Sequence, residues 1–142
     1  MRTMLTAILF LFLTSCSQEP EAINFGVDNC SFCKMTIMDQ KFATQCISKK
    51  GKTFKFDDLH CMIHFMKNGG VWSNEVGKVY IADYAEQGKW IEADKAFILH
   101  SESLKSPMGG NYAAFGDYTK LENAMKQFNG EKTEWKKLTS EK

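Results

Sequence analysis

An internal repeat of residue types constrains the fold of this chain more than any other feature. The sequence FDD at 56–58 precedes a helix-like segment that ends at NG, residues 68–69. The sequence FGD at 115–117 precedes a second such segment, which ends at NG, residues 129–130. An aspartate suits the N-cap of a helix because its carboxylate accepts hydrogen bonds from free backbone N–H groups, and Asn-Gly suits a left-handed C-terminal cap. Both segments are therefore predicted to be helices.

Strand-like residues flank each predicted helix, and a Lys-Gly-Lys turn between the first two such segments indicates a hairpin. The expected strands are 42–48, 53–56 and 78–84 in the first half, and 96–100, 111–115 and 133–138 in the second. The order strand, strand, helix, strand occurs twice. We therefore predict an α+β fold in which two consecutive ββαβ units, at about 41–84 and 90–138, pack as one small domain over residues 26–142.

The N-terminus has the parts of an export signal. Arg2 supplies a positive charge, and residues 4–13 form an almost unbroken apolar run. A run of about ten residues is too short to cross a bilayer as a helix, which needs about twenty. Residues 13–16, Leu-Thr-Ser-Cys, resemble the lipobox of bacterial lipoproteins, in which the cysteine is acylated and becomes the new N-terminus. A buried core helix and a cleaved signal without lipid are the alternatives.

We therefore predict a signal peptide over residues 1–15 and a lipid on Cys16, followed by a polar, flexible tether over residues 16–25. Lipidation would make the protein exported and membrane-anchored, facing the periplasm. An aspartate after the cysteine would resemble a retention signal for the inner membrane. Ser17 stands there instead, which slightly favours the outer membrane.

The charge of the chain argues against nucleic acid as a partner, and its length sets the number of domains. Arg2 is the only arginine, so the chain without residues 1–15 carries 17 lysines against 17 acidic residues. No basic patch stands out, which argues against nucleic acid as a partner. About 127 residues are enough for one compact domain.

Sulfur ligands are concentrated in residues 30–38. Cys33 and Met35 form a Cys-x-Met pair, and Cys30 adds a Cys-x-x-Cys pair. Thiolate and thioether are soft donors that favour Cu(I) over hard cations. Met108 lies far along the chain in a Ser-Pro-Met-Gly-Gly loop, which would join the first two strands of the second unit. That loop could reach the Cys-x-Met segment if the two units pack face to face.

Other interpretations of these residues stay open. Cys30 and Cys33 could form a thiol–disulfide redox pair, although no strand precedes them as in thioredoxin-like sites. A structural zinc site is another alternative, and His60 and His64 are spaced i, i+4 for joint ligation. The other candidates suit ordinary structural roles: Cys46 and Cys61 as core thiols or a disulfide, and His100 as a surface residue.

Several short motifs, taken in order behind a lipobox, resemble the NosL family of accessory lipoproteins encoded alongside nitrous oxide reductase. The motifs are FCKM at 32–35, FDD at 56–58, VYIADY at 79–84, WIEA at 90–93, SPMGG at 106–110 and AAF at 113–115. The resemblance covers most of the chain after the signal. It implies two ββαβ units, which agrees with the repeat.

The resemblance also implies a function. It predicts a periplasmic Cu(I)-binding metallochaperone, not an enzyme, that supplies copper for the Cu–sulfide cluster of nitrous oxide reductase. The family's ligands correspond to Cys33, Met35 and Met108. Many members have a histidine close before the Phe-Cys, whereas this chain has Ser31 and Cys30 there, so Cys30 is a less certain ligand.

The expected partners are nitrous oxide reductase or the ABC transporter of its assembly machinery, and the membrane through Cys16. The sequence leaves open the copper recipient, self-association through copper and the binding of a second metal.

Overall fold

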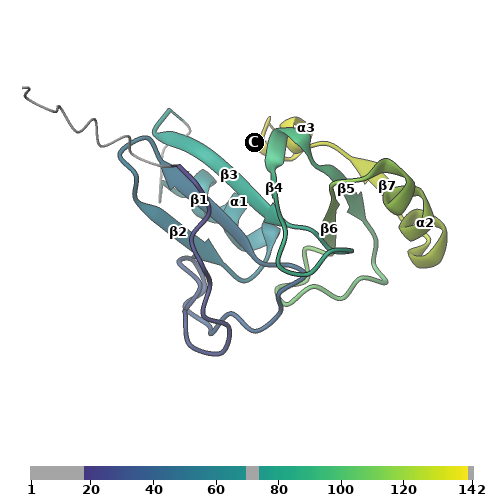
Figure 1. Cartoon of the computed structure of the whole chain (residues 1–142), viewed down its shortest axis with the longest axis horizontal. Coiled ribbons are helices and arrows are strands. Elements are labelled where there is room, and N and C mark those ends of the chain that lie inside the picture. The colour runs from purple at the N-terminus through teal and green to yellow at the C-terminus, as the bar shows by residue number, and fades with distance from the viewer. Residues whose placement is uncertain (1–17, 70–73, 141–142) are drawn as a thin grey trace, which may run out of the picture.

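Two antiparallel sheets, one from each half of the chain, form the fold in the computed structural model, which describes residues 18–69 and 74–140 (Figure 1). The predicted signal peptide and Cys16 lie outside these residues. The first sheet has the strand order β2-β1-β3-β4. Its elements are β1 (Thr44–Ser48), β2 (Thr53–Phe56), α1 (Leu59–Lys67), β3 (Val76–Ala82) and β4 (Trp90–Glu92).

The second sheet has the order β6-β5-β7. It is preceded by a 3-10 turn, η1 (Ala93–Lys95), and its elements are β5 (Phe97–His100), β6 (Tyr112–Phe115), α2 (Tyr118–Phe128), β7 (Glu131–Thr133) and α3 (Trp135–Ser140). In both units the first strand is central, the second and third strands flank it, and the helix connects those two. The predicted α+β architecture of two ββαβ units is confirmed.

The predicted helix caps are present. Asp58 accepts a hydrogen bond from the backbone N–H of Cys61 at 3.0 Å, and Asp117 accepts one from Lys120 at 2.9 Å. Asn129 ends α2 in the left-handed conformation. After α1 the left-handed residue is Gly69, with a φ of 80°. The Asp and Asn-Gly signals therefore marked both helices correctly.

The C-terminal strand predicted over 133–138 is wrong. The strand β7 stops at Thr133, and residues from Trp135 onward form the helix α3. Trp135 and Leu138 are three residues apart. Leu138 belongs to the hydrophobic core that includes Phe56 and Met62, and Trp135 packs against that core. Their spacing fits one face of a helix. The short strand β4 was also not predicted, because its three residues precede a tight turn.

The two units are joined at the end of β3. Asp83 and Ala114 form a parallel bridge, and Tyr84 donates its N–H to the Ala114 carbonyl at 2.8 Å. The buried carboxylate of Asp83 accepts hydrogen bonds from Ala85 and, across the junction, from Gly116 at 3.2 Å. These bonds fix the second unit against the first.

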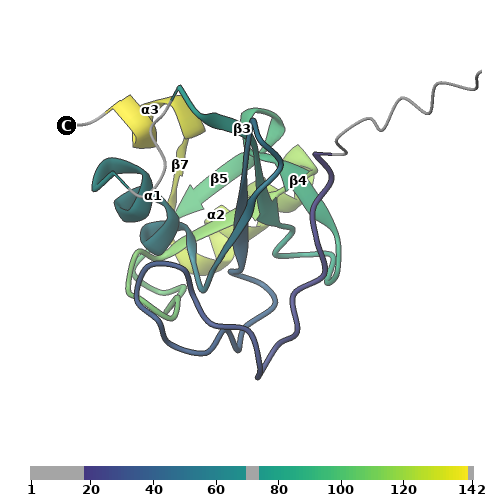
Figure 2. The ribbon, with the colours of Figure 1, turned by 90° about the vertical axis from the view of Figure 1, so that its left-hand side faces the viewer.

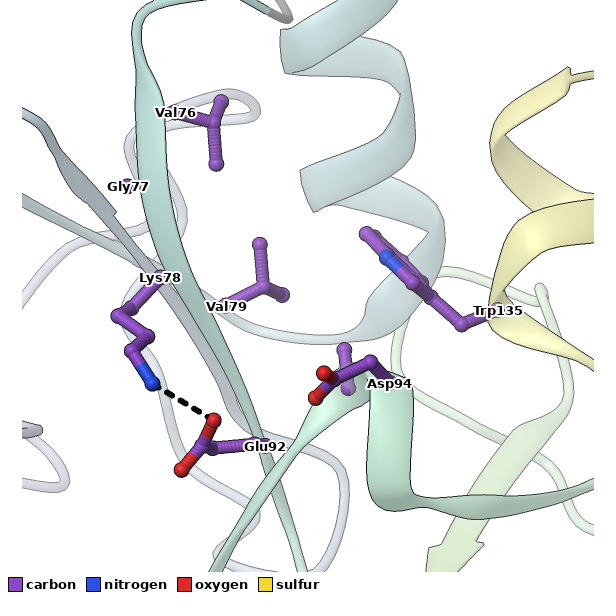
Figure 3. Close-up of a pocket in the computed structure, with 8 residues that line it drawn as sticks. Val76, Gly77, Lys78, Val79, Glu92, Asp94 and Trp135 are labelled. Atoms are coloured by element: carbon purple, nitrogen blue, oxygen red, sulfur yellow. Dashed lines mark hydrogen bonds and ion pairs between the residues drawn. The ribbon is translucent and has the colours of Figure 1, made fainter.

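A cavity of about 320 Å³ lies where β3, η1 and α3 meet (Figure 3). Lys78 and Glu92 form an ion pair of 2.7 Å at its edge. Its lining residues are Val76, Gly77, Lys78, Val79, Glu92, Ala93, Asp94 and Trp135. None of these described residues is a cysteine, histidine or methionine, so the cavity is no site for a soft metal.

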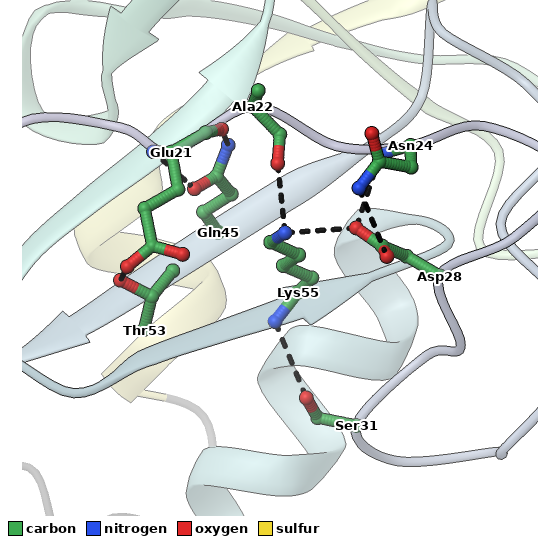
Figure 4. A network of polar contacts seen from close by, with 8 residues as sticks. All are labelled: Glu21, Ala22, Asn24, Asp28, Ser31, Gln45, Thr53 and Lys55. Atoms are coloured by element: carbon green, nitrogen blue, oxygen red, sulfur yellow. Dashed lines mark hydrogen bonds and ion pairs between the residues drawn. The ribbon is translucent and has the colours of Figure 1, made fainter.

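The segment predicted as a flexible tether differs from expectation in its described part. Residues 18–25 lie along the first sheet and are hydrogen-bonded to it (Figure 4). Glu21 and Gln45 exchange two bonds, of 3.0 and 2.7 Å, and Tyr80 donates its hydroxyl to the Gln18 carbonyl at 2.9 Å. Ile23 is buried. The polar composition suggested a solvated leash, but these polar groups bond to the sheet.

Candidate metal centre

The Cys-x-x-Cys pair lies on a tight turn closed by an antiparallel bridge between Asn29 and Thr36. Cys30 donates its N–H to the Met35 carbonyl at 2.8 Å, and Lys34 donates to the Cys30 carbonyl at 3.1 Å. Lys34 has a φ of 67°, which lets the chain reverse direction within four residues. The turn therefore holds Cys30 and Cys33 on one short rigid segment.

The strand β2 anchors this turn. Ser31 donates its N–H to the Lys55 carbonyl at 2.7 Å, and Lys55 returns a bond from its N–H to the Ser31 hydroxyl at 3.2 Å. The Lys55 ammonium also pairs with Asp28 at 2.8 Å (Figure 4). Because β2 leads directly into α1, the anchored turn lies beside the first turn of that helix, which contains Cys61.

The sulfur atoms of Cys30, Cys33 and Cys61 all lie within 4.8 Å of one another. Cys30 and Cys61 are buried, and Cys33 is partly exposed. Sulfurs that share one metal at bond lengths of about 2.3 Å lie about 4 Å apart, so the three need only a small closure to bind one ion. Within the described residues no other group of three His, Cys, Asp or Glu side chains is placed in this way.

Hydrogen bonds make Cys30 the preferred thiolate of the three. The Cys61 thiol donates to the Cys30 sulfur, and so do the backbone N–H groups of Asp57, Cys33 and Phe32; together they lower the pKa of Cys30 to about 5. The same hydrogen bond and burial raise the pKa of Cys61. Burial also raises the pKa of Cys33. The metal-free cluster therefore carries one thiolate and two thiols near neutral pH.

A buried carboxyl group lies behind the cluster. Asp57 is 4 % exposed, and its Oδ1 has no hydrogen-bond partner among the described residues. Burial, and then the negative charges of Cys30 and Asp58, raise the pKa of Asp57 to about 6. Near neutral pH Asp57 is thus mostly ionised, and its charge adds to the attraction of the site for a cation.

Asp58 connects the helix of the first unit to the loop that carries Met108. One carboxylate oxygen accepts the Cys61 N–H at 3.0 Å, and the other accepts the Ser106 hydroxyl at 2.9 Å and the Met108 N–H at 3.0 Å. The loop also approaches α1 closely, because a Cβ at Gly110 would lie 2.6 Å from the Cβ of His60. The residue Met108 is thus held beside the first turn of α1.

The structure brings together only part of the predicted ligand set. Cys30 and Cys33 lie in one cluster, and Met108 and Cys33 both pack against the core around it. The loop with Met108 joins β5 to β6, as predicted, and it reaches the first unit. The side chain of Met35 is 57 % exposed, so it lies at the outer surface of the turn.

Cys61 is the residue that sequence reasoning missed. It is a buried thiol, as predicted, but its sulfur lies in the thiol cluster with Cys30 and Cys33 and not merely in the core. Its position in the first turn of a predicted helix was the available signal, because residues of a first turn lie next to the chain that leads into the helix. Its closeness to Cys30 depends on the bonds between the turn and β2, which no spacing rule gives.

The remaining candidates have separate roles. Cys46 is buried, and its pKa is raised to about 11 by burial, as expected of a core thiol. The four cysteines of the described residues are all free thiols, so no disulfide forms among them. The rings of His60 and His64, which lie one turn apart on α1, contact each other with centroids 4.2 Å apart and a tilt of 40°. Burial and the charges of His60 and Lys67 lower the pKa of His64.

The two sheets and the thiol cluster define a small α+β protein with a soft-donor metal centre at the junction of a turn and a helix. The model of the NosL family matches residues 24–142, and the chain belongs to that family.

The fold agrees with a solved member. The chain is similar to the crystal structure of the copper chaperone NosL from Shewanella denitrificans, with a TM-score of 0.76 and 19 % identity over 87 % of this chain and 98 % of that one. A search of curated proteins found no match. Among the described residues, no helix has the length and apolar character needed to cross a membrane.

Proposed function

We propose that this protein is an exported, lipid-anchored Cu(I) metallochaperone that supplies copper for the maturation of nitrous oxide reductase. The observation that carries the proposal is the convergence of three free thiols, Cys30, Cys33 and Cys61, in a chain of the NosL family. Thiolate and thioether are soft ligands, which favour Cu(I) over hard cations such as Mg²⁺ and Ca²⁺.

The proposed site uses the thiolates of Cys33 and Cys30 with the thioether of Met108, and Cys61 as a third thiolate when copper is bound. Copper binding releases the protons of Cys33 and Cys61, because only the deprotonated sulfur is a ligand. Met35, at the exposed side of the turn, is the ligand through which copper enters and leaves. The family resemblance supports Cys33, Met35 and Met108, and the geometry supports the addition of Cys30 and Cys61.

Transfer would proceed by ligand exchange and not by catalytic turnover. Cys33 is partly exposed while Cys30 and Cys61 are buried, so a ligand of the recipient reaches the copper from the side of Cys33. The buried thiolates keep the ion bound until that ligand has joined it. This arrangement suits a carrier that never releases free copper.

The proposed function also includes a location in the cell and a recipient for the copper. A lipid on Cys16 would anchor the protein to a membrane with its domain in the periplasm, the outer membrane being slightly favoured. The recipient would be nitrous oxide reductase or the ABC transporter of its assembly machinery. Anchoring increases the effective concentration of the carrier near a membrane-bound partner.

A Cu(I) titration in competition with a chromophoric Cu(I) chelator tests the site. The wild-type chain should take up one tightly bound Cu(I), and Cys33→Ser should abolish that binding. Met35→Leu should weaken it about tenfold, whereas Met38→Leu is the matched control, since Met38 is a neighbouring methionine that is 68 % exposed. Unchanged affinity in Cys33→Ser would exclude the proposed site.

Two alternatives make different predictions. The lowered pKa of Cys30 next to Cys33 favours a thiol–disulfide redox protein, which would reduce insulin disulfides and form a trapped mixed disulfide, with Met35 irrelevant. The three clustered thiols also favour a structural zinc site, in which chelation would unfold the domain. A copper carrier should keep its fold when copper is removed, so near-UV circular dichroism of the metal-free and metal-loaded protein separates these cases.

A further inference from the structure

The N-terminal segment determines which end of the molecule faces the membrane if Cys16 carries lipid, as the proposed function holds. Gln18 is the first described residue, and it lies against Gly77 at the start of β3, with its carbonyl bonded to Tyr80. From there the segment runs along the sheet to Ala22, whose carbonyl accepts a bond from the Lys55 ammonium at 2.7 Å. The segment thus begins at one end of the first sheet and reaches the other.

The two ends of the first sheet carry different features. The turn between β1 and β2 lies at the end where the described chain begins, and the loop of residues 24–37 lies at the opposite end (Figures 1 and 2). The register agrees, because Thr53 at the start of β2 pairs with Ile47 next to the turn, whereas Phe56 pairs with Thr44 at the far end. The thiol cluster therefore lies away from the point at which the chain enters the domain.

The turn at the entry end is basic. Its exposed residues Lys49, Lys50 and Lys52 form what we call the basic tip. Within the described residues none of these three ammonium groups is ion-paired with a carboxylate, whereas Lys55, Lys78, Lys89, Lys95 and Lys120 all are. Two acidic residues lie close to the tip. The carbonyl of Glu75 accepts the Lys49 N–H at 2.8 Å, and the carboxylate of Glu21 accepts the Thr53 hydroxyl at 2.6 Å. The tip retains a net positive charge.

We infer that the basic tip binds the anionic headgroups of the membrane that holds the lipid, so that the thiol cluster is presented away from the bilayer. Only Ser17 separates Gln18 from Cys16, and two residues span at most about 7 Å. The short link keeps the entry end of the domain near the headgroups. Each lysine near an anionic surface increases the affinity for that surface about fivefold. The attraction acts only within a Debye length, which is about 10 Å.

Charge complementarity identifies the partner as anionic phospholipid. A neutral phosphatidylcholine surface offers no net charge to the tip, and a protein partner at this end would have to fit between the domain and the bilayer. The geometry leaves the side with Cys33 free for the recipient of the copper. The basic tip thus orients the domain on the membrane but does not contact the copper or its recipient.

Lysine footprinting of the full lipidated protein tests this orientation. The protein is extracted from membranes and reconstituted into vesicles of phosphatidylcholine alone or with one-third phosphatidylglycerol, and it is acetylated with a neutral amine reagent and analysed by mass spectrometry. Acetylation of Lys49, Lys50 and Lys52 should be at least fivefold slower on the anionic vesicles. High salt should remove most of that difference.

Lys105 and Lys126 are internal controls, because both are exposed and belong to the second unit; their rates should not change. Equal rates at the tip in both vesicle types would overturn the inference, as would slower labelling at Lys34 beside the thiol cluster. The intact mass of the extracted protein reports the lipid on Cys16 independently. A missing lipid would overturn the proposed anchor, whereas a lipidated protein with an unprotected tip would overturn only the orientation.

Discussion

The two ββαβ units share a topology but differ in the loops and helix ends that carry chemistry. In the first unit the strands β1 and β2 are joined by a tight turn, and α1 begins beside three thiols. In the second unit the connection from β5 to β6 spans residues 101–111, and α2 begins at an exposed cap. The longer loop folds onto the first unit through Asp58. The candidate site thus combines Cys61 of the first unit, Cys30 and Cys33 of the turn that precedes that unit, and a loop of the second unit.

The largest expected difference between the units is in copper affinity. Cys61→Ser should lower Cu(I) affinity at least a thousandfold, about 4 kcal/mol, because it removes a buried sulfur of the cluster. Cys46→Ser is the control: it changes a buried thiol on β1 outside the cluster, so it should leave the affinity within about threefold. Competition with a Cu(I) chelator measures both. Equal losses in the two variants would mean that Cys61 acts through folding alone.

The two helix caps should differ in their effect on stability. Asp58→Ala should lower the free energy of unfolding by about 3 kcal/mol, since a buried carboxylate loses three hydrogen bonds and Ser106 loses its partner. Asp117→Ala removes only an exposed cap and should cost about 1 kcal/mol. Denaturant unfolding of the metal-free protein gives both values. If Asp117→Ala were as costly as Asp58→Ala, the link between the units would not contribute.

The thiolate of Cys30, on the turn that packs against the first unit, should make stability depend on pH. The pKa of Cys30 is about 5 in the folded protein against an ordinary 9.0, so between these values the unfolded chain binds one more proton. Stability of the metal-free protein should therefore increase with pH, by about 2 kcal/mol between pH 6 and pH 8. Below pH 5 the Cys30 thiol is protonated in both states, so its contribution to stability has been lost.

Unfolding midpoints across this range provide the measurement. Cys30→Ser removes the titrating group and should flatten the profile between pH 6 and pH 8. Below pH 6 a second group matters. The pKa of Asp57 is raised to about 6, so its protonation increases the stability of the folded protein as the pH falls and opposes the effect of Cys30. A flat wild-type profile would show that Cys30 is not the thiolate.

The smallest expected effect measures what the second unit contributes to copper binding. Met108→Leu keeps the volume of the side chain but removes the thioether, so Cu(I) affinity should decrease about tenfold, or 1.4 kcal/mol. Met125→Leu on α2 is the matched control and should leave the affinity unchanged. If both variants bound copper as the wild type does, the second unit would serve only to support the fold.

Local signals predicted the repeated elements well. The aspartates at positions 58 and 117 and the Asn-Gly pairs marked the helices, because a cap depends on neighbouring residues in the sequence. The segment 133–138 was predicted wrongly, because it is too short for the spacing of Trp135 and Leu138 to distinguish a helix from a strand. The polar residues 18–25 misled for the opposite reason, because their bonding partners lie on the sheet and far away in sequence.

The sequence by itself determined which soft donors the chain contains, Cys30, Cys33, Met35 and Met108 among them, and it predicted the two-unit architecture. Only the tertiary structure decided that Cys61 lies with Cys30 and Cys33, because that contact depends on the hydrogen bonds between Ser31 and Lys55. It also decided that Asp58 holds the loop of Met108. Ligand types are a property of residues, whereas their convergence is a property of long-range contacts that no local pattern encodes.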